Sequence, residues 1–571
     1  MMAMLSSPLL CGAFNLSNTL GDGMVLQRTQ AATVWGFGDP GVTVTTTFLG
    51  ATLQTTVGQD GVWRQALPPQ KATATPTTLS FVGSDGGTAQ LRDVLFGDVF
   101  LCGGQSNMQY TPRSMDGMNN MSAEIAAADN YPNIRFFTVG MQTKCGGSGV
   151  DNCTQPFREL NTFAPTPTCK TGGSCRHGWG RANASSLGAT PPVGPAGGSA
   201  WDTFSAVCWL HGREVHDALG GSVPIGLISS NWGGTSVQHW QPLASMRDCT
   251  PGATAGGDLY NSMIAPFTVG PMAMTGAIWY QGEANVGGAA YYSCGFPSMI
   301  SRWREAFKNS ALWFGFVQIA GYRYSTPYGP NGTLPEVDHS HHAGDLRQSQ
   351  LAALALPLVG LSTAVDTGDW VNIHPPDKQN PARRLAKQAL RQVYGLPVDG
   401  AEFPMYAGSS TVRRNGDVTV TVAIRAGGKP VKLTTDAPAS ATQSTTLGKG
   451  PEVKRNECVT AQPALGRAFA EDCGYPAILG VNATTGAALS LNATATIGAD
   501  GSSIVLSATA PEGFTPTSSS YGRASWPRVV FFADELPVIP WYANFSTTNP
   551  WTPPTWLADE TARVQAAMVE A

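Results

Sequence analysis

With 571 residues, the chain is too long for a single hydrophobic core, so more than one domain is expected. Its net charge is −4 at pH 7 and no stretch concentrates Lys and Arg, which argues against nucleic acid as a partner. Only 13% of the residues are charged, whereas Gly (66) and Pro (41) are abundant, a composition that favours many turns and short strands over long surface helices.

The first segment of the chain is apolar. Residues 1–17 have the composition of a signal-peptide core but lack the positively charged residues that normally precede one. A weak leader, a disordered N-terminus and a truncated start all remain open for this segment. No run of about 18 uncharged apolar residues occurs in the chain, so the sequence predicts no membrane span.

Residues 18–95 carry a strand-and-turn pattern. Segments such as ATVWGFG, VTVTTTFLG, TTLSFVG and AQLRDVL are short, rich in Val, Thr and aromatic residues, and separated by Gly, Asp and Pro. The pattern predicts an N-terminal β-sandwich-like domain over 18–95. AQLRDVL is its expected last strand, and a new strand, DVFLCGG, is expected to open the next domain.

From residue 96 to about 400, strands alternate with helices. Buried strands are expected at 98–104, 223–230, 274–282, 312–321 and 359–366, with helices at 205–221, 291–309 and 345–357. Such alternation predicts a fold of the α/β class, with a mostly parallel sheet covered by helices on both faces. In sheets of this kind, ligands bind beyond the carboxyl ends of the strands.

Two regions depart from this alternation. Residues from about 140 to 200 lack periodicity and are rich in Cys, Gly and Pro, which indicates a disulfide-pinned insertion, since so long a loop is seldom a plain connection. Beyond residue 400, strand patterns such as DVTVTVAI and SSIVLSATA return and predict a C-terminal β-rich domain over 401–571. A short helix is expected at 559–571.

The cysteines and glycosylation motifs point to the secretory route. Of 11 cysteines, ten remain if the apolar segment with Cys11 is removed, and an even number suits a disulfide framework in an oxidising compartment. The pairings stay open. Asn-x-Ser/Thr motifs occur at Asn15, Asn120, Asn152, Asn183, Asn331, Asn482, Asn492 and Asn544. A lysosomal, vacuolar or extracellular location is therefore favoured.

No metal site is expected. The cysteines show no Cys-x-x-Cys pair and no Cys/His ligand spacing, so metal binding is a poor explanation for them. The cluster of His339, His341 and His342 lacks carboxylate or cysteine residues at ligand spacing. A solvated loop is the better interpretation of that cluster.

Polar residues and glycines follow four predicted strands, in CGGQSNM (102–108), SSNWGGTS (229–236), WYQGEAN (279–285) and DTGDWVNIHPPDK (366–378). If the strands are parallel neighbours, these four ends meet at one edge of the sheet. Taken alone, Ser106 is best explained as a helix N-cap, and Met108 breaks the Gly-x-Ser-x-Gly elbow. A strand-to-helix turn is nevertheless a good place for a nucleophile, because the helix N-terminus and nearby amides stabilise an oxyanion.

The other strand ends carry groups that a serine nucleophile needs. His374 follows a strand end and precedes a Pro-Pro turn, which makes it the candidate base, with a surface turn histidine as the alternative. Asp369 and Asp366 lie upstream as candidate partners of its ring, or as turn caps. Gly233 and Asn285 are candidate oxyanion donors, though ordinary turn chemistry also explains them.

Taken together, these segments resemble the sialate O-acetylesterase family within the wider SGNH hydrolase group. The resemblance is carried by DGMVLQR (22–28), LFGDVFLCGGQSNM (95–108), SAVCWLHGREVHDALGGSVPIGLISSNWGGTSVQHW (205–240), IWYQGEANVG (278–287) and HPPDKQNPARRLAKQAL (374–390). It covers most of residues 18–400 and extends more loosely to YGRASWPRVVFFADELPVIPW (521–541). It implies an SGNH-hydrolase-like three-layer α/β/α catalytic domain over 96–400, flanked by N-terminal and C-terminal β-rich domains.

The resemblance also implies an activity: hydrolysis of acetyl esters on sugar hydroxyls, typically those of 9-O-acetylated sialic acids, without a cofactor or metal. Carried over residue by residue, it makes Ser106 the nucleophile and His374 the general base. The amides of Ser106 and Gly233 and the side chain of Asn285 become the oxyanion hole. The residues expected to line or brace the substrate pocket are Gln105, Gln281 and Glu283.

The acidic residue departs from the pattern of the group. SGNH enzymes commonly place an aspartate three residues before the histidine, where this chain has Val371. Relatives often have an acidic residue two before it, where this chain has Asn372. Asp369 is assigned as the acidic residue that orients the His374 ring, with Asp366 as substitute. A Ser–His dyad supported by a main-chain carbonyl is the third alternative.

Two other functions remain open. Deacetylation of xylan or another plant or algal polysaccharide keeps the chemistry, and no single residue separates it from sialate deacetylation. A non-catalytic glycan-binding relative would keep only the scaffold, but Ser106 and His374 are both present, which disfavours it. The expected partner in each case is an acetylated sugar or glycan, and the sequence does not indicate an oligomeric state.

Overall fold

The structure is a computed structural model of the 571-residue chain. It describes residues 14–112, 121–140, 153–160, 177–188, 201, 203–322, 324, 341–369, 372–414, 416–434, 476–527 and 529–545. Several features expected from the sequence lie outside these ranges: the leader, the terminal helix, and the cysteines Cys145, Cys169, Cys175, Cys458 and Cys473.

A sheet of eleven strands forms the centre of the molecule. Its parallel part runs in the order β9 (Ile134–Thr138), β11 (Ile225–Asn231), β8 (Thr88–Gly104), β12 (Gly276–Tyr280), β13 (Trp313–Gln318) and β14 (Val359–Thr363). β10 (His177–Arg181) adds an antiparallel edge next to β9. Parallel neighbours need crossover connections, which the helices supply. The α/β class expected from the alternation is thus confirmed.

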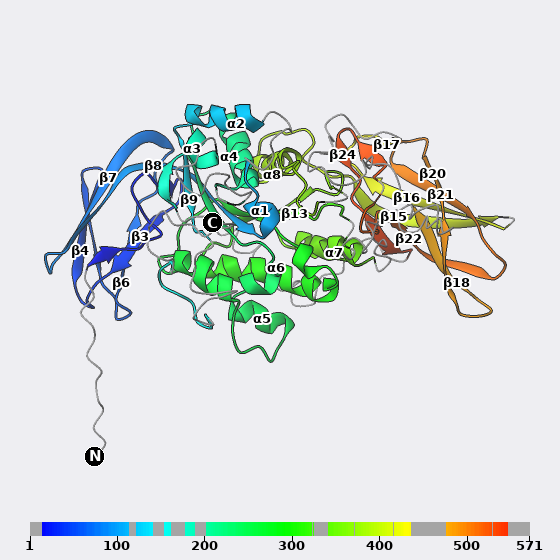
Figure 1. The fold of residues 1–571 in the computed structure, drawn as a ribbon, viewed down its shortest axis with the longest axis horizontal. Helices are drawn as coiled ribbons and strands as arrows, with labels where there is room; N and C mark the ends of the chain where they lie inside the picture. The colour runs from blue at the N-terminus through cyan, green and yellow to red at the C-terminus, as the bar shows by residue number, and fades with distance from the viewer. Residues whose placement is uncertain are drawn as a thin grey trace, which may run out of the picture.

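Helices cover both faces of this sheet (Figure 1). α4 (Ala206–Ala218) and α8 (Gln379–Gln392) pack together on one face, and α5 (Leu243–Cys249) and α6 (Ala289–Ala306) on the other. The strand residues alternate accordingly: Ile278 of β12 joins the core under α4 and α8, whereas its neighbour Trp279 joins the core under α6. None of the helices in the described ranges is long and apolar enough to cross a membrane.

The strand β8 connects the N-terminal strands to the central sheet. Its first half pairs with β7 (Thr73–Gly83) and β2 (Val25–Gln27), and its second half with β11 and β12. The sequence predicts two strands divided near 95/96, but the structure has a single strand of 17 residues. Gly97 explains the difference. A Cβ there would lie 1.9 Å from the carbonyl oxygen of Pro224, so this glycine permits close packing within the sheet rather than a turn.

The other N-terminal strands form two layers. β4 (Thr43–Phe48) and β5 (Ala51–Thr56) extend the sheet beside β7. A separate sheet contains β1 (Asn15–Leu16), β3 (Ala32–Phe37) and β6 (Val62–Leu67). The buried rings of Trp63 on β6 and Phe81 on β7 lie 5.2 Å apart, so the two sheets face each other across a shared core.

The region expected to be an insertion, about 140–200, is described only in part. Its described residues include β10 and the short helix α3 (Ala184–Leu187), so part of it extends the central sheet. Cys153 takes part in a disulfide. Two further disulfides, Cys102–Cys208 and Cys249–Cys294, connect β8 to α4 and α5 to α6.

The C-terminal strands lie at the opposite end of the molecule from the N-terminal ones (Figure 1). They form three sheets. The strands are β15 (Met405–Arg414), β16 (Asp417–Arg425), β21 (Ser503–Thr509) and β20 (Thr494–Ile497); β19 (Ala488–Asn492), β18 (Ala477–Asn482), β22 (Phe514–Tyr521) and β25 (Trp541–Asn544); and β17 (Val431–Leu433), β23 (Phe531–Ala533) and β24 (Leu536–Pro537). They share one apolar core that includes Val420, Phe514 and Trp541.

Helix α7 (His342–Gln350) joins the C-terminal strands to the central sheet. The guanidinium of its Arg347, which is fully buried, donates hydrogen bonds to main-chain carbonyls on both sides. These acceptors are Ile319 and Ala320 after β13, and Ala524 and Ser525 after β22. A single side chain thus satisfies four carbonyl groups at the junction.

Candidate active site

The carboxyl ends of the central strands border a cavity of about 510 Å³. All four segments that follow predicted strands contribute to it, with residues 105–106 after β8, 233–234 after β11, 283–284 after β12 and 373–374 after β14. Within the described residues, the lining is Gln105, Ser106, Gln109, Trp201, Gly233, Gly234, Glu283, Ala284, Ile373 and His374. The structure therefore brings together Ser106, Gly233 and His374, as well as Gln105 and Glu283.

Ser106 begins the short helix α1 (Ser106–Gln109) directly after β8. The N-cap position of this helix is Gln105, whose side chain makes no capping hydrogen bond, so Ser106 is the first residue of the helix rather than its N-cap. Gly104 makes the turn possible: its φ is +138°, and a Cβ would lie 2.2 Å from the Tyr280 carbonyl oxygen. Within the described residues, the Ser106 hydroxyl has no hydrogen-bond partner, and it borders the cavity.

Gly233 lies against the nucleophile candidate. A Cβ at this position would come within 3.2 Å of Ser106 Cβ, so only glycine brings this main chain so close without displacing its neighbours. The Gly233 amide donates a hydrogen bond to Gln109 Oε1 at 3.0 Å. Gln109 was not singled out from the sequence, although it follows Ser106 by three residues and therefore lies one helical turn away on the same side of α1.

Asn285 and Gln281 do not line the cavity. The Asn285 Nδ2 donates to Gln238 Oε1 at 3.0 Å, and its Oδ1 accepts from the Val237 amide and Gln281 Nε2, both at 2.8 Å. Gln281 is fully buried and also donates to Gln105 Oε1 at 3.1 Å. These side chains brace the loop after β12 from behind the cavity. The oxyanion role of Asn285 stays a prediction.

Glu283 borders the cavity from the loop after β12. Its Oε1 accepts a hydrogen bond from Asn107 Nδ2, while its buried Oε2 has no partner within the described residues. Burial raises the pKa of this carboxyl group, since the charged form loses its hydration. Glu283 is thus a buried acid beside Ser106 with one oxygen uncommitted.

His374 lies in the loop between β14 and α8, and its ring is held between aromatic neighbours. The ring stacks on Tyr110 at 6.0 Å and meets Trp201 edge-on at 4.9 Å. Burial and the charge of Lys378 lower its pKa to about 4, so the imidazole is neutral at physiological pH. A neutral imidazole is the form that can accept a proton from a serine hydroxyl. No hydrogen bond joins the His374 ring to Ser106 within the described residues.

The two candidate acids have different surroundings. Asp369 Oδ1 accepts a hydrogen bond from the Asn372 amide at 3.1 Å, and Asn372 Oδ1 accepts one from the His374 amide at 2.9 Å, so both side chains stabilise the turn that leads to the histidine. Asp366 is buried, and each of its oxygens lies 2.7 Å from a nitrogen of Arg384. Val371 lies outside the described residues. The orienting role of Asp369 stays a prediction.

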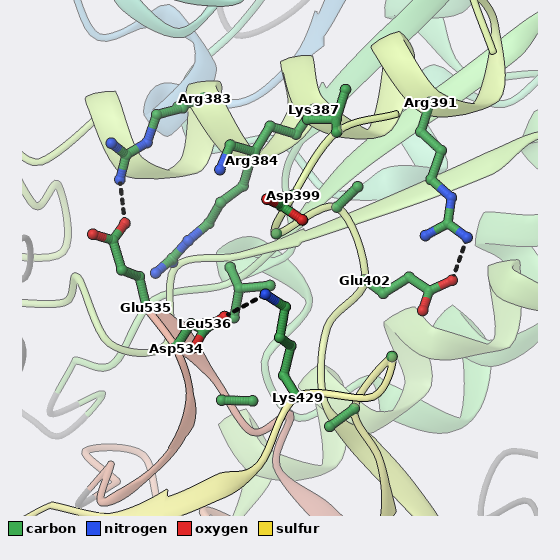
Figure 2. A pocket seen from close by; sticks show the side chains of 16 residues that line it. Arg383, Arg384, Lys387, Arg391, Asp399, Glu402, Lys429, Asp534, Glu535 and Leu536 are labelled. Carbon is green, nitrogen blue, oxygen red and sulfur yellow. Dashed lines mark hydrogen bonds and ion pairs between the residues drawn. The ribbon is translucent and has the colours of Figure 1, made fainter. Parts of the chain in front are cut away.

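A second cavity, of about 400 Å³, lies between α8 and the C-terminal strands (Figure 2). Most of its charged side chains pair with one another. Arg391 contacts Glu402 at 2.5 Å, Lys429 contacts Asp534 at 3.3 Å, and Arg383 contacts Glu535 at 3.4 Å. Among the residues that the structure describes, its lining contains no Ser, Cys or His. The first cavity is therefore the better candidate for an active site.

The described part of the chain offers no cluster of metal-binding side chains. It contains no group of three or more His, Cys, Asp or Glu side chains that could hold a metal ion. Of the histidine cluster considered from sequence, His341 and His342 are at the start of α7, and His339 lies outside the described residues.

Residues 210–389 match a family model described as carbohydrate esterase, sialic acid-specific acetylesterase. The sialate O-acetylesterase of Pongo abelii is 30% identical over 421 residues, which covers 67% of this chain and 71% of that protein. The sialate O-acetylesterase of Mus musculus is 29% identical over 449 residues, covering 67% and 74%. Among solved structures, a carbohydrate acetylesterase from Xanthomonas citri matches with a TM-score of 0.66 and 27% identity, covering 93% of this chain and 99% of that one.

Proposed function

Because this chain belongs to the sialate O-acetylesterase family, we propose that it hydrolyses acetyl esters on sugar hydroxyls, most readily those of 9-O-acetylated sialic acids. Its membership of a family of carbohydrate esterases makes it an esterase. The observation that supports the finer assignment is the cavity at the strand ends, which Ser106, Gly233 and His374 border together.

In the proposed reaction, Ser106 is the nucleophile and His374 the general base. The imidazole takes the proton of the Ser106 hydroxyl while Oγ attacks the acetyl carbonyl carbon. When the tetrahedral intermediate collapses, the sugar oxygen leaves and takes the proton from the imidazolium. A water molecule then gives its proton to His374 and attacks the acetyl-enzyme, which releases acetate and restores Ser106.

The oxyanion hole in this proposal consists of the Ser106 and Gly233 amides with the Asn285 side chain. The Gly233 amide now donates to Gln109, so the substrate oxygen has to replace Gln109 Oε1 as its acceptor. The Asn285 Nδ2 now donates to Gln238, so its participation requires that this side chain turns toward the cavity. If the Asn285 side chain does not turn, the Ser106 and Gly233 amides alone form the oxyanion hole. Each lost donor typically costs about 100-fold in rate or more.

The third member of the site is proposed to be Asp369, which acts by holding the turn before His374 through Asn372. The buried ion pair of Asp366 with Arg384 favours Asp369 over its substitute. A Ser–His dyad supported by a main-chain carbonyl is the alternative arrangement for this site.

The cavity lining supports entry of the substrate with its acetyl end first. Within the described residues the lining contains no Arg or Lys that would bind the carboxylate of a sialic acid. The 9-O-acetyl group, at the end of the glycerol side chain of that sugar, can reach Ser106 while the carboxylate stays outside. The lining offers Trp201 and Ile373 as apolar contacts for the acetyl group or sugar.

The proposal includes a location and an architecture. The disulfides Cys102–Cys208 and Cys249–Cys294 support an oxidising compartment, and so a lysosomal or extracellular location. The helices on both faces of the central sheet support an SGNH-hydrolase-like three-layer catalytic domain over 96–400, with β-rich domains over 18–95 and 401–571.

The proposal is tested by measuring acetate release from a small acetyl ester. Ser106→Ala and His374→Gln are each expected to lower kcat by about 1000-fold or more, because each removes a group that acts in the transition state. Ser222→Ala, at an exposed serine after α4, serves as the matched control and is expected to match the wild type. Equal rates for Ser106→Ala and the wild type would overturn the nucleophile assignment.

The substrate class is tested separately with the wild-type protein. We expect a higher kcat/KM for 9-O-acetylated N-acetylneuraminic acid than for acetylated xylo-oligosaccharides. The reverse order would retain the esterase mechanism and replace the proposed substrate with a plant or algal polysaccharide. No acetate from either substrate, with intact binding to glycans, would favour the non-catalytic alternative.

A further inference from the structure

Two fully buried residues that the proposed mechanism does not use, Asn107 and Lys378, connect the nucleophile turn to the histidine loop. Asn107 follows Ser106 in α1, and Lys378 lies at the N-terminal end of α8. Lys378 Nζ donates a hydrogen bond to Asn107 Oδ1 at 2.8 Å. Ser106 and His374 are thus connected by a hydrogen bond between two neighbouring side chains: Asn107 follows Ser106 by one residue, and Lys378 follows His374 by four.

These two side chains also hold the main chain on both sides of His374. Asn107 Nδ2 donates to the carbonyl oxygen of Ile373 at 3.0 Å, and Lys378 Nζ donates to the carbonyl oxygen of Pro375. The main chain on both sides of the histidine is therefore tied to Asn107, directly at Ile373 and through Lys378 at Pro375. This arrangement limits how far the imidazole can move relative to Ser106.

The position of Lys378 is costly for a cation. It is buried, it lies at the positive end of a helix dipole, and within the described residues no carboxylate forms a direct ion pair with it. Its surroundings are the carboxylates of Glu283, Asp377 and Asp369 and the rings of Tyr110 and Tyr280, whose centroids lie 4.8 and 5.7 Å from Nζ. A methionine would fill the same space at lower cost, so the charge calls for an explanation.

We propose that Asn107 and Lys378 are positioning residues of the esterase reaction: they hold His374 against Ser106, and the charge of Lys378 keeps the imidazole unprotonated in acidic solution. This inference rests on the proposed roles of Ser106 and His374. It extends them to a specific consequence, an enzyme whose base remains functional in an acidic compartment.

The electrostatics of the loop support the second part of the proposal. Within the described residues, the His374 ring contacts Tyr110 and Trp201, and burial together with the nearby charge of Lys378 lowers the His374 pKa to about 4. Burial lowers the pKa of Lys378 to about 7, so this side chain is charged in the acidic range in which the imidazole titrates. The same charge makes the imidazole a weaker base, which is the cost of the arrangement.

Two variants separate the charge of Lys378 from its hydrogen bonds. Lys378→Met removes both, whereas Lys378→Gln removes the charge and keeps a donor. In both, the acid limb of the kcat/KM profile is expected to move from about pH 4 toward the ordinary histidine value of about 6.5. Lys378→Met is also expected to lower the plateau of kcat by about 100-fold with little change in KM, because the base is no longer held in place.

The matched control is Lys387→Met, which removes another lysine with a lowered pKa from the same helix, in the second cavity. Its pH profile is expected to match that of the wild type. Asn107→Ala should lower kcat without changing KM. Its control, Asn261→Ala, removes a buried asparagine that holds one carbonyl, that of Cys153, and should lower only the thermal stability.

A second measurement does not depend on turnover. The histidine ring protons are titrated by NMR in folded protein, with the His374 signal assigned by its loss in His374→Gln. An upward shift of this titration in Lys378→Met or Lys378→Gln supports the proposal even if a variant is inactive. An unchanged titration together with an unchanged acid limb would overturn it. If Ser106→Ala kept its activity, the proposed catalytic function would be wrong. The NMR titration would still show whether Lys378 lowers the pKa of His374.

Discussion

The amide of Gly233 donates a hydrogen bond to the side-chain oxygen of Gln109 at 3.0 Å, beside the β-carbon of Ser106. In the substrate-free enzyme, Gln109 therefore satisfies a donor that the proposed mechanism requires for the oxyanion. A substrate oxygen has to displace it, at the cost of one hydrogen bond, about 1 kcal/mol.

Two substitutions of Gln109 should therefore change kcat/KM in opposite directions, because one frees the Gly233 amide and the other binds it more tightly. Gln109→Ala frees the Gly233 amide and is expected to raise kcat/KM by up to about fivefold. Gln109→Glu places a carboxylate on the same amide, where it binds more tightly and repels the oxyanion, so kcat/KM should fall by about 100-fold. Both are measured with a small acetyl ester. Similar losses in the two variants would show instead that Gln109 supports the site.

Loss of Asp366 should affect the stability of the fold, whereas loss of Asp369 should affect catalysis. Asp366→Asn leaves the buried guanidinium of Arg384 without its carboxylate and is expected to lower the free energy of unfolding by about 3–5 kcal/mol. Its kcat, corrected for folded protein, should change little. Asp369→Ala should retain stability and lower kcat at least about tenfold, because the turn before His374 loses an acceptor. Urea unfolding and acetate release distinguish the variants. If the Asp366 variant lost activity and the Asp369 variant lost stability instead, Asp366 would be the acid of the site.

His211 should make the stability of the fold depend on pH. Its ring is fully buried in α4, stacked on Trp313 at 6.0 Å, and neither ring nitrogen has a hydrogen-bond partner within the described residues. Burial lowers its pKa to about 3. The folded state thus requires the neutral ring, and the unfolded state binds a proton below its pKa of about 6.5.

The stability contributed by the neutral His211 ring is therefore complete above about pH 6.5 and is lost as the pH falls toward 3. Between pH 6.5 and 5, the wild type should lose about 2 kcal/mol of unfolding free energy to this group. His211→Phe keeps an aromatic ring and removes the titration, so its loss over that range should be smaller by this amount. Urea unfolding at the two pH values provides the measurement, and parallel losses in both proteins would contradict it.

Arg347 should be essential for the junction between α7 and the C-terminal strands. Arg347→Met leaves the carbonyls of Ile319, Ala320 and Ala524 without the donor that this side chain provides and is expected to lower the free energy of unfolding by about 3–5 kcal/mol. The Ser525 carbonyl keeps a hydrogen bond from the Tyr322 amide. The C-terminal strands should become the first site of limited proteolysis. Arg414→Met, at an exposed arginine of β15, is the control. Identical melting temperatures for the two variants would contradict the expectation.

The strand ends could be predicted from sequence because they depend on local patterns. Buried strands of β-branched and apolar residues alternate with helices, and polar residues follow the strands, so Ser106, Gly233 and His374 were expected to meet at one edge of the sheet. The structure brings these three to one cavity. The sequence motif places the residues along the chain, and the parallel sheet brings them together in space.

The directions of individual side chains could not be predicted in the same way. Asn285 faces Gln238 rather than the cavity, and Lys378 reaches Asn107 across 271 positions of the chain. Such contacts depend on rotamers selected by tertiary packing, which leave no periodic signal in the sequence. Gly97 within β8 illustrates a related point. A glycine that permits close approach of another strand has the same appearance in a sequence as one that makes a turn.

The continuity of β8 bears on how such proteins can be recombined. The residues that pair with β7 at one end of the strand are on the same backbone segment as Gly104, two residues before the proposed nucleophile. A chimera joined at residue 95 or 96 would combine halves of one strand from different parents. An exchange of the N-terminal sheets between relatives would therefore need its junction before Thr88, with the whole of β8 inherited together with Ser106.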